Sequence, residues 1–103
     1  MSTRKSSAKK FLEKLRGGPL SFGKMIESIR LADEISQVEL AKQMKISRAH
    51  LCDVEKGRRT ISVERAAQFA EVLGYSVNQF VAVAVEDQLR RAGIKAKVHL
   101  EAA

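Results

Sequence analysis

Two short helical patterns separated by a three-residue break dominate this sequence of 103 residues. In the stretch from Gln37 to Lys56, apolar residues recur at helical spacing on both sides of residues 44–46. Ser36 and Ser47 each precede one of these patterns, where a serine hydroxyl can accept hydrogen bonds from the first-turn N–H groups of a helix. Helices joined by so short a corner cross at a steep angle. The stretch therefore predicts a helix–corner–helix unit.

This unit resembles the helix-turn-helix of the Cro and phage-repressor (XRE-like) family of DNA-binding domains. The matching residues are Gln37, Ala41, Ile46, Leu51, Val54 and the closing Glu55, Lys56 and Gly57. The resemblance extends more loosely over about residues 20–80, and it implies an all-α, five-helix lambda-repressor-like domain. Lys45 departs from the family pattern, which usually has glycine at the corner. If the corner requires a positive φ, lysine bears a strain of roughly 1 kcal/mol.

Three further helical patterns flank the unit, and a serine opens each of them. Residues 20–35 contain an apolar stripe at helical spacing that Ser21 opens, a mostly apolar pattern runs from Ser62 to Gly74, and a last helix over about residues 77–92 follows Ser76. A chain of this length builds one domain with a single modest core. We therefore expect one helical domain over residues 19–93.

The net charge of +7 is unevenly placed. Residues 1–18 carry six basic residues and one acidic residue, whereas residues 19–93 carry eleven basic and ten acidic residues. We predict a basic N-terminal arm over residues 1–18, which either reaches DNA or keeps the protein in solution. The basic residues of the domain gather around the second helix of the unit: Lys42, Lys45, Arg48, Lys56, Arg58 and Arg59. A basic face of this kind is typical of a module that binds a polyanion.

Several classes of protein are disfavoured by what the sequence lacks. Cys52 is the only cysteine, so neither an intramolecular disulfide nor a cysteine pair for zinc is available, and a cytoplasmic setting fits. His50 and His99 are too isolated to indicate a metal site. The longest apolar run is too short to span a membrane. No nucleophile–base pair or phosphate-binding loop is recognisable, and we expect neither an enzyme nor a cofactor.

The family resemblance implies that the second helix of the unit enters the major groove of DNA, where each base pair shows a different donor and acceptor pattern. The residues expected to read bases are Arg48, Ala49, His50 and Asp53. Asp53 either accepts a hydrogen bond from cytosine, positions Arg48, or is a solvated residue that discourages non-specific binding. The residues expected to contact phosphates are Gln37, Ser47, Lys56, Arg58 and Arg59. The resemblance also implies a partly buried ion pair between Arg30 and Glu55.

Two C-terminal features lack a burial partner within one chain. The run from Phe80 to Val85 is apolar on every side of the predicted helix, although its β-branched residues also permit a strand. Residues 94–100 alternate between apolar and polar, which predicts a short β-strand that must pair with its own copy, join a partner's sheet edge, or stay disordered. A two-fold homodimer would satisfy both features. The expected interface consists of Phe80, Val81, Val83, Val85, Ile94, Val98 and Leu100.

Three functions are compatible with these features. The first is a dimeric transcriptional repressor that binds an inverted-repeat operator in double-stranded DNA. The second is an antitoxin that neutralises a toxin protein and regulates its own operon. The third is a bridging cofactor that uses the same fold to bind proteins, which a less basic second helix would favour.

Overall fold

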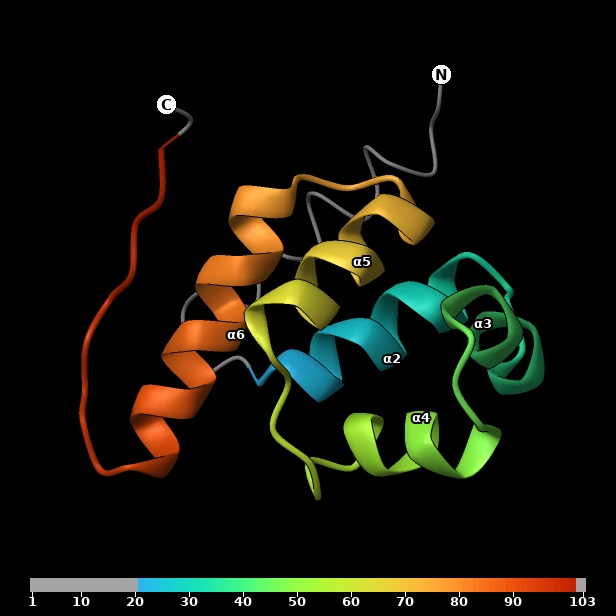
Figure 1. Cartoon of the computed structure of the whole chain (residues 1–103), viewed down its shortest axis with the longest axis horizontal. Coiled ribbons are helices and arrows are strands. Elements are labelled where there is room, and N and C mark those ends of the chain that lie inside the picture. Colours follow the sequence, from blue (N-terminus) through green and yellow to red (C-terminus); the bar gives the residue numbers. More distant parts are fainter. Residues whose placement is uncertain (1–20, 102–103) are drawn as a thin grey trace.

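The computed structural model describes residues 21–101, which form five α-helices followed by an extended tail. The helices are α2 (Phe22–Ala32), α3 (Gln37–Met44), α4 (Arg48–Glu55), α5 (Val63–Leu73) and α6 (Val77–Arg91), as Figure 1 shows. The five-helix domain expected from the sequence is thus confirmed. The predicted basic arm, residues 1–18, lies outside the described residues.

Serine begins each of these five helices. The hydroxyl of each N-cap serine accepts a hydrogen bond from the backbone N–H three residues further on, over 2.9–3.3 Å. The five caps are Ser21, Ser36, Ser47, Ser62 and Ser76. Each bond satisfies a first-turn N–H group that has no partner within the helix, and such a cap stabilises a helix by about 1 kcal/mol. Local sequence alone therefore determines where each helix begins.

The corner between α3 and α4 requires a left-handed backbone conformation. Lys45 has φ 59° and ψ 41°, and the next N–H, that of Ile46, donates to the carbonyl of Ala41 over 3.0 Å. This geometry is typical of a Schellman turn, in which glycine is the preferred residue at the left-handed position. The positive φ considered for Lys45 is confirmed. Glu34, at φ 58°, ends α2 in the same way and was not anticipated.

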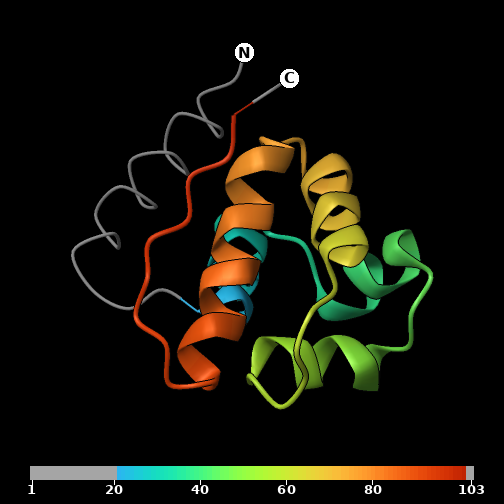
Figure 2. The same cartoon turned by 60° about the vertical axis from the view of Figure 1, so that its left-hand side comes forward.

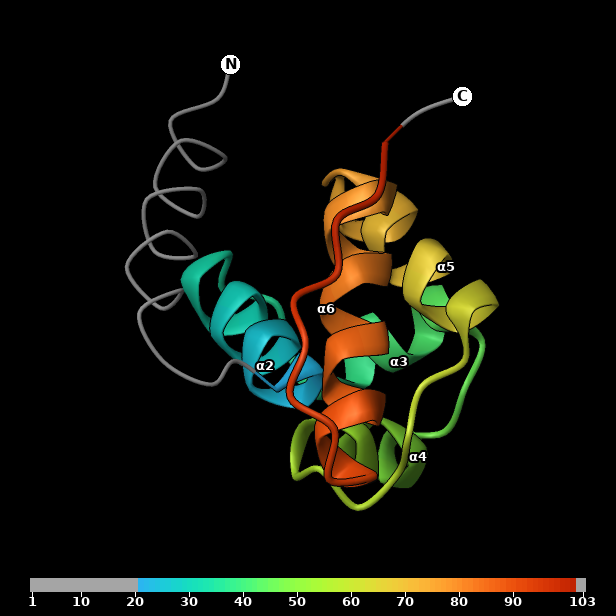
Figure 3. The same ribbon diagram turned by 90° about the vertical axis from the view of Figure 1, so that its left-hand side faces the viewer.

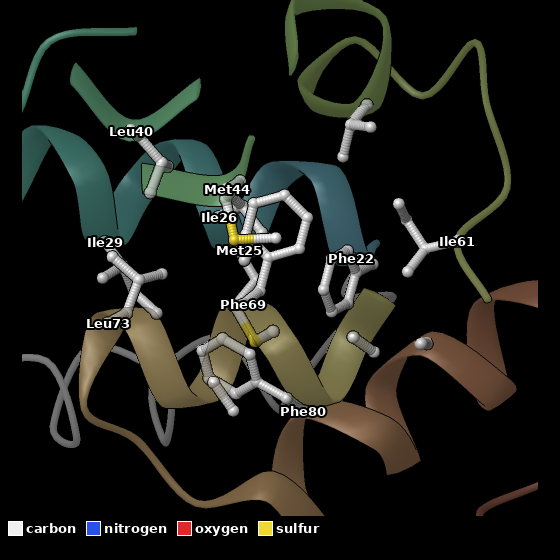
Figure 4. Close-up of a cluster of buried hydrophobic side chains, with 14 of the residues drawn as sticks. Phe22, Met25, Ile26, Ile29, Leu40, Met44, Ile61, Phe69, Leu73 and Phe80 are labelled. Carbon is white, nitrogen blue, oxygen red and sulfur yellow. The ribbon is translucent and has the colours of Figure 1, made fainter. Parts of the chain in front are cut away.

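The core is built around α2, which packs against α4 and α6, while α5 packs against α6 and α3 against both α4 and α5. Three phenylalanines from different helices meet in it (Figure 4). The ring of Phe22 lies edge-on to the rings of Phe69 and Phe80, at centroid distances of 5.7 and 6.0 Å. Aromatic side chains bury large apolar areas, so this cluster joins α2, α5 and α6 into one body.

Gly23 allows α2 to approach α4 more closely than any other residue would. A Cβ atom at this position would lie 2.1 Å from the carbonyl oxygen of Val54 and 2.9 Å from that of Glu55. Both oxygens belong to the backbone of α4, so they cannot move without shifting the helix. The end of α4 therefore rests directly on the first turn of α2.

The structure corrects the assignment of Phe80 and Val81 to a dimer interface. Phe80 is 0% exposed and Val81 is 8% exposed, because α6 is covered by both α5 and α2. Val83 and Val85 are partly buried and pack against the same core. The single domain supplies α6 with two packing partners, whereas the sequence argument allowed it only one. The apolar run Phe80 to Val85 lies wholly within this helix, so the alternative strand is not formed.

The strand predicted for residues 94–100 is not formed in the described chain. These residues are extended and run back along α6, on its outer side (Figures 1 and 3). Three hydrogen bonds join the tail to α6: the Ile94 N–H donates to the Leu89 carbonyl over 2.8 Å, the Val98 N–H donates to the Glu86 carboxylate over 2.7 Å, and the Asn78 amide donates to the Leu100 carbonyl over 3.5 Å. A β-strand requires a neighbouring strand, and residues 21–101 contain none.

Candidate nucleic-acid interface

Helix α4 lies along one edge of the domain, with α2 behind it and no other helix covering its opposite side (Figure 1). Its inner face carries Leu51 and Val54, which are fully buried. Its outer face carries Arg48 and Ala49, which are exposed, and His50 and Asp53, which are partly exposed. The structure therefore brings all four predicted base-reading residues to one accessible face of a single helix.

A buried polar cluster fixes the orientation of α4. The guanidinium of Arg30 on α2 donates two hydrogen bonds to the Glu55 carboxylate, from Nε to Oε2 over 2.7 Å and from Nη2 to Oε1 over 3.2 Å. The hydrogen bond to Glu55 raises the pKa of Arg30 above its ordinary value. A third Arg30 nitrogen, Nη1, donates to the Ile35 carbonyl over 2.9 Å. The ion pair that the family resemblance implied is present, and it joins α2, the turn before α3, and α4.

Gln37 belongs to this cluster as well as to the outer surface. Its side-chain amide donates to Oε1 of Glu55 over 2.9 Å. The side chain predicted to contact a phosphate is therefore already engaged, which leaves the backbone N–H of Gln37, in the first turn of α3, for that contact. The same holds for Ser47, whose hydroxyl caps α4 by accepting from the His50 N–H over 2.9 Å.

His50 lies among positive charges on the outer face of α4. Burial contributes most to lowering its pKa below the ordinary value, and the charges of Arg59 and Arg65 lower it further, while Asp53 acts in the opposite direction. With a pKa below its ordinary 6.5, the imidazole is mainly neutral at pH 7. His50 then offers one hydrogen-bond donor and one acceptor.

Asp53 is paired with the two arginines that follow α4. Its Oδ1 lies 3.3 Å from Nη1 of Arg58, and its Oδ2 lies 3.9 Å from Nε of Arg59. Arg48, the alternative partner predicted for Asp53, forms no ion pair with it within residues 21–101. Lys56, the C-cap of α4, is exposed at the same end of the helix. Three residues predicted to contact phosphates, Lys56, Arg58 and Arg59, therefore lie together at the C-terminal end of α4.

The loop that carries these arginines is fixed from behind by α6. The Arg91 guanidinium donates to the Gly57 carbonyl over 2.8 Å, and the Gln88 amide donates to the Ile61 carbonyl. Figure 2 shows the loop between α4 and α5 passing beside the C-terminal end of α6. Sequence reasoning missed Gln88 and Arg91, because they lie 27 and 34 residues from their partners and no local pattern connects them.

Arg65 is a further residue of this surface that the sequence analysis did not assign. Its guanidinium donates to the Gln68 side chain over 3.1 Å and to the Met44 carbonyl over 3.5 Å, next to the corner between α3 and α4. The Gln68 amide donates to the same carbonyl over 3.4 Å. The first turns of α5 therefore support the corner. The sequence signal that could have found Arg65 was the concentration of basic residues around α4, which Arg65 extends into α5.

The fold and this arrangement of helices agree with a comparison against known families. Residues 26–80, from α2 to the first turn of α6, match the family model described as Helix-turn-helix. The chain belongs to the helix-turn-helix family. Its helix-turn-helix unit consists of α3, the corner at Lys45, and α4.

Two known proteins resemble this helix-turn-helix chain over part of their length. The immunity repressor protein of Bacillus phage phi105 is 32% identical over 62 residues, which make up 60% of this chain and 43% of that protein. The control protein C.BamHI of Bacillus amyloliquefaciens is 32% identical over 56 residues, which make up 53% of this chain and 69% of that protein. The chain thus matches less than half of the phage repressor. No solved structure matches the chain.

Neither a metal site nor a membrane-spanning helix is found in the part of the chain that the structure describes. Among residues 21–101, no three His, Cys, Asp or Glu side chains lie together in a way that would hold a metal ion. None of the helices there combines the length and apolar character that crossing a membrane requires.

Proposed function

We propose that this protein binds double-stranded DNA through α4 and acts as a dimeric transcriptional repressor. The observation that carries the proposal is the outward row of Arg48, Ala49, His50 and Asp53 on a helix whose inner face is locked by the Arg30–Glu55 pair. A helix that projects from a flat surface fits the major groove, and a fixed orientation is what reading bases requires. The activity is binding without catalysis, takes place in the cytoplasm, and needs no cofactor.

The proposed contacts divide into two kinds. Arg48 donates two hydrogen bonds to guanine, at O6 and N7, and Ala49 contacts a thymine methyl group. His50 and Asp53 form hydrogen bonds with the edges of neighbouring bases. The backbone N–H groups at the starts of α3 and α4, together with Lys56, Arg58 and Arg59, bind phosphates and set the position of the protein on the duplex. The basic surround of α4 favours this function over a protein-binding bridging cofactor.

The similarity to an immunity repressor and to a control protein supports a role in regulation. Repression follows if the operator overlaps a promoter. The test is a mobility-shift titration of the protein against duplex DNA over a series of salt concentrations. Binding is expected to weaken steeply with salt, and Arg58→Ala is expected to weaken binding and to reduce the salt slope by about 1. Failure to shift any duplex at low salt would overturn the proposal.

The dimer is part of the proposal, with an interface revised by the structure. Phe80 and Val81 are occupied in the core, which leaves the exposed side chains of Ile94 and Leu100 and the partly buried Val83, Val85 and Val98 on α6 and the tail. Two tails pairing antiparallel across a two-fold axis would supply the strand partner that one chain lacks. The same axis would place two copies of α4 roughly 34 Å apart on an inverted-repeat operator.

Sedimentation equilibrium tests the assembly with the full chain, with Val98→Asp and with a chain ending at Gly93. We expect a dimer that both changes weaken. A monomer at micromolar concentration would overturn the dimer. Persistence of the dimer in both variants would place the interface on the helices and leave the tail available to another protein.

That last outcome bears on a second candidate function, an antitoxin that binds a toxin protein through its tail and regulates its own operon. The observation that favours it is the extended tail, whose backbone is joined to α6 by three hydrogen bonds and to no strand within residues 21–101, so that it can add to the edge of a partner's sheet. A protein encoded beside this one that binds the full chain but not the chain ending at Gly93 would identify such a partner.

A further inference from the structure

The Asp53 carboxylate is shared between two arginines on the surface proposed to face DNA. Arg58 lies 3.3 Å from one carboxylate oxygen and Arg59 lies 3.9 Å from the other. The two arginine side chains are 66% and 54% exposed, so they are accessible to a ligand while they are paired. We name this arrangement of Asp53, Arg58 and Arg59 the arginine clamp.

The end of α4 builds the first half of the clamp through its backbone. Gly57 has φ 77°, its N–H donates to the Val54 carbonyl over 3.1 Å, and the Arg58 N–H donates to the Asp53 carbonyl over 2.8 Å. In a Schellman turn the two residues joined by this second bond usually make an apolar side-chain contact. Here those two residues are Asp53 and Arg58, so an ion pair occupies the position of the apolar contact.

The backbone around the clamp is fixed, whereas its side chains are not. Arg91 holds the Gly57 carbonyl and Gln88 holds the Ile61 carbonyl, on either side of the two arginines. Arg58 and Arg59 can therefore leave Asp53 by side-chain rotation alone, without any movement of the loop. An exposed ion pair of this kind is weak enough for a DNA phosphate to compete for the arginine.

We propose that Asp53 is a specificity-determining residue that withholds Arg58 and Arg59 from DNA of unmatched sequence. This inference rests on the proposed DNA binding by α4. When both arginines move to phosphates, the Asp53 carboxylate loses its partners and lies unpaired beside a polyanion. A base that presents an amino group in the major groove, cytosine through N4 or adenine through N6, donates to Asp53 and replaces a lost bond, whereas guanine and thymine present only acceptors there. The clamp thus lowers the affinity for most sequences and leaves the affinity for a matching sequence high.

The test measures full-chain binding by fluorescence anisotropy on two duplexes, one of mixed sequence and one selected by the wild-type protein. Asp53→Asn removes the charge and keeps the shape of the side chain. Without the carboxylate, both arginines are free to bind phosphates. Because breaking two exposed ion pairs is no longer required, we expect binding to the mixed duplex to tighten by about two- to tenfold. Binding to the selected duplex is expected to change less or to weaken, so the ratio of the two affinities falls.

Two controls separate the clamp from a general charge effect. Glu71→Gln removes one negative charge from an exposed residue of α5 and is expected to leave both affinities close to wild type. In an Arg58→Ala, Arg59→Ala background, Asp53→Asn is expected to have less than half of its effect, because the clamp is already open.

Three results would overturn the clamp: unchanged mixed-sequence binding in Asp53→Asn, equal tightening by Glu71→Gln, or an undiminished effect of Asp53→Asn without the two arginines. A wild-type protein that binds neither duplex would overturn the proposed function itself.

Discussion

Arg30 and Glu55 form a buried, bidentate ion pair that links the end of α2 to the end of α4. Nε lies 2.7 Å from Oε2, and Nη2 lies 3.2 Å from Oε1. Gln37 adds a third hydrogen bond to the same carboxylate. Because Glu55 is the last residue of α4, the pair determines the angle at which that helix leaves the domain. Desolvation offsets much of the attraction between the two charges, so the main consequence of the pair is orientation.

Breaking this pair from one side is expected to destabilise the domain strongly. Glu55→Ala leaves the Arg30 guanidinium buried without its counter-charge, which costs about 3–5 kcal/mol, whereas Arg30→Met combined with Glu55→Leu restores most of the stability. Urea unfolding measures both, with Glu71→Ala as an exposed control. If the double variant is stable and yet binds DNA as tightly and as selectively as wild type, the orienting role is wrong.

Gly23→Ala is expected to separate α2 from α4. The added methyl group would lie 2.1 Å from the Val54 carbonyl oxygen, and relieving that overlap requires a shift of helix backbone. The cost is about 3 kcal/mol or more, at the upper end of overpacking effects. Lys24→Ala, at the exposed neighbouring position, is the matched control and should differ from wild type by less than about 0.5 kcal/mol. Equal unfolding midpoints for the two variants would contradict the close helix contact.

Lys45→Gly is expected to stabilise the protein, since glycine adopts φ 59° without strain. The gain is about 0.5–1 kcal/mol, because greater freedom of the unfolded chain offsets part of the relieved strain. Lys42→Gly, the same change inside α3, should instead cost about 0.5–1 kcal/mol. Thermal unfolding of the two variants compares them directly, and a shift in the same direction for both would rule out strain at Lys45.

DNA binding is expected to strengthen as the pH falls from about 8 to about 6. The lowered pKa keeps His50 neutral in the free protein, whereas nearby phosphates favour the protonated imidazole, so binding takes up a proton. The free energy of unfolding changes with pH in the opposite direction. As the pH falls, His50 is protonated in the unfolded chain before it is protonated in the folded one, so the folded protein loses stability below pH 6.5. Anisotropy titrations should show a weaker pH dependence of affinity in His50→Gln but not in His99→Gln. The same slope in all three proteins would exclude His50.

Local sequence predicted the parts of the fold that depend on a few neighbouring residues. Each serine N-cap is confirmed because the cap requires only a hydroxyl and an N–H three residues away. Lys45 was identified because its position in the unit is normally glycine. The spacing of Leu51 and Val54 likewise separated the inner face of α4 from its outer face.

Features that depend on distant residues were missed or misassigned. The burial of Phe80 depends on two helices that cover α6 from different sides, which its own apolar run does not reveal. Gly23 gave no signal because its constraint comes from α4, about thirty residues later. Asp53 was correctly placed on the outer face, but its partners depend on the turn at Gly57 that brings Arg58 back toward the helix.

The most direct test of DNA reading by α4 is selection of binding sites from a random duplex library by the full chain and by Arg48→Ala. The wild-type protein should enrich an inverted repeat with half-sites about one helical turn apart. Arg48→Ala should enrich the same repeat with relaxed preference at one base pair per half-site, a loss of about 1–3 kcal/mol there. An identical motif from both proteins would remove Arg48 as a base reader, and no enriched motif from the wild-type protein would contradict sequence-specific binding altogether.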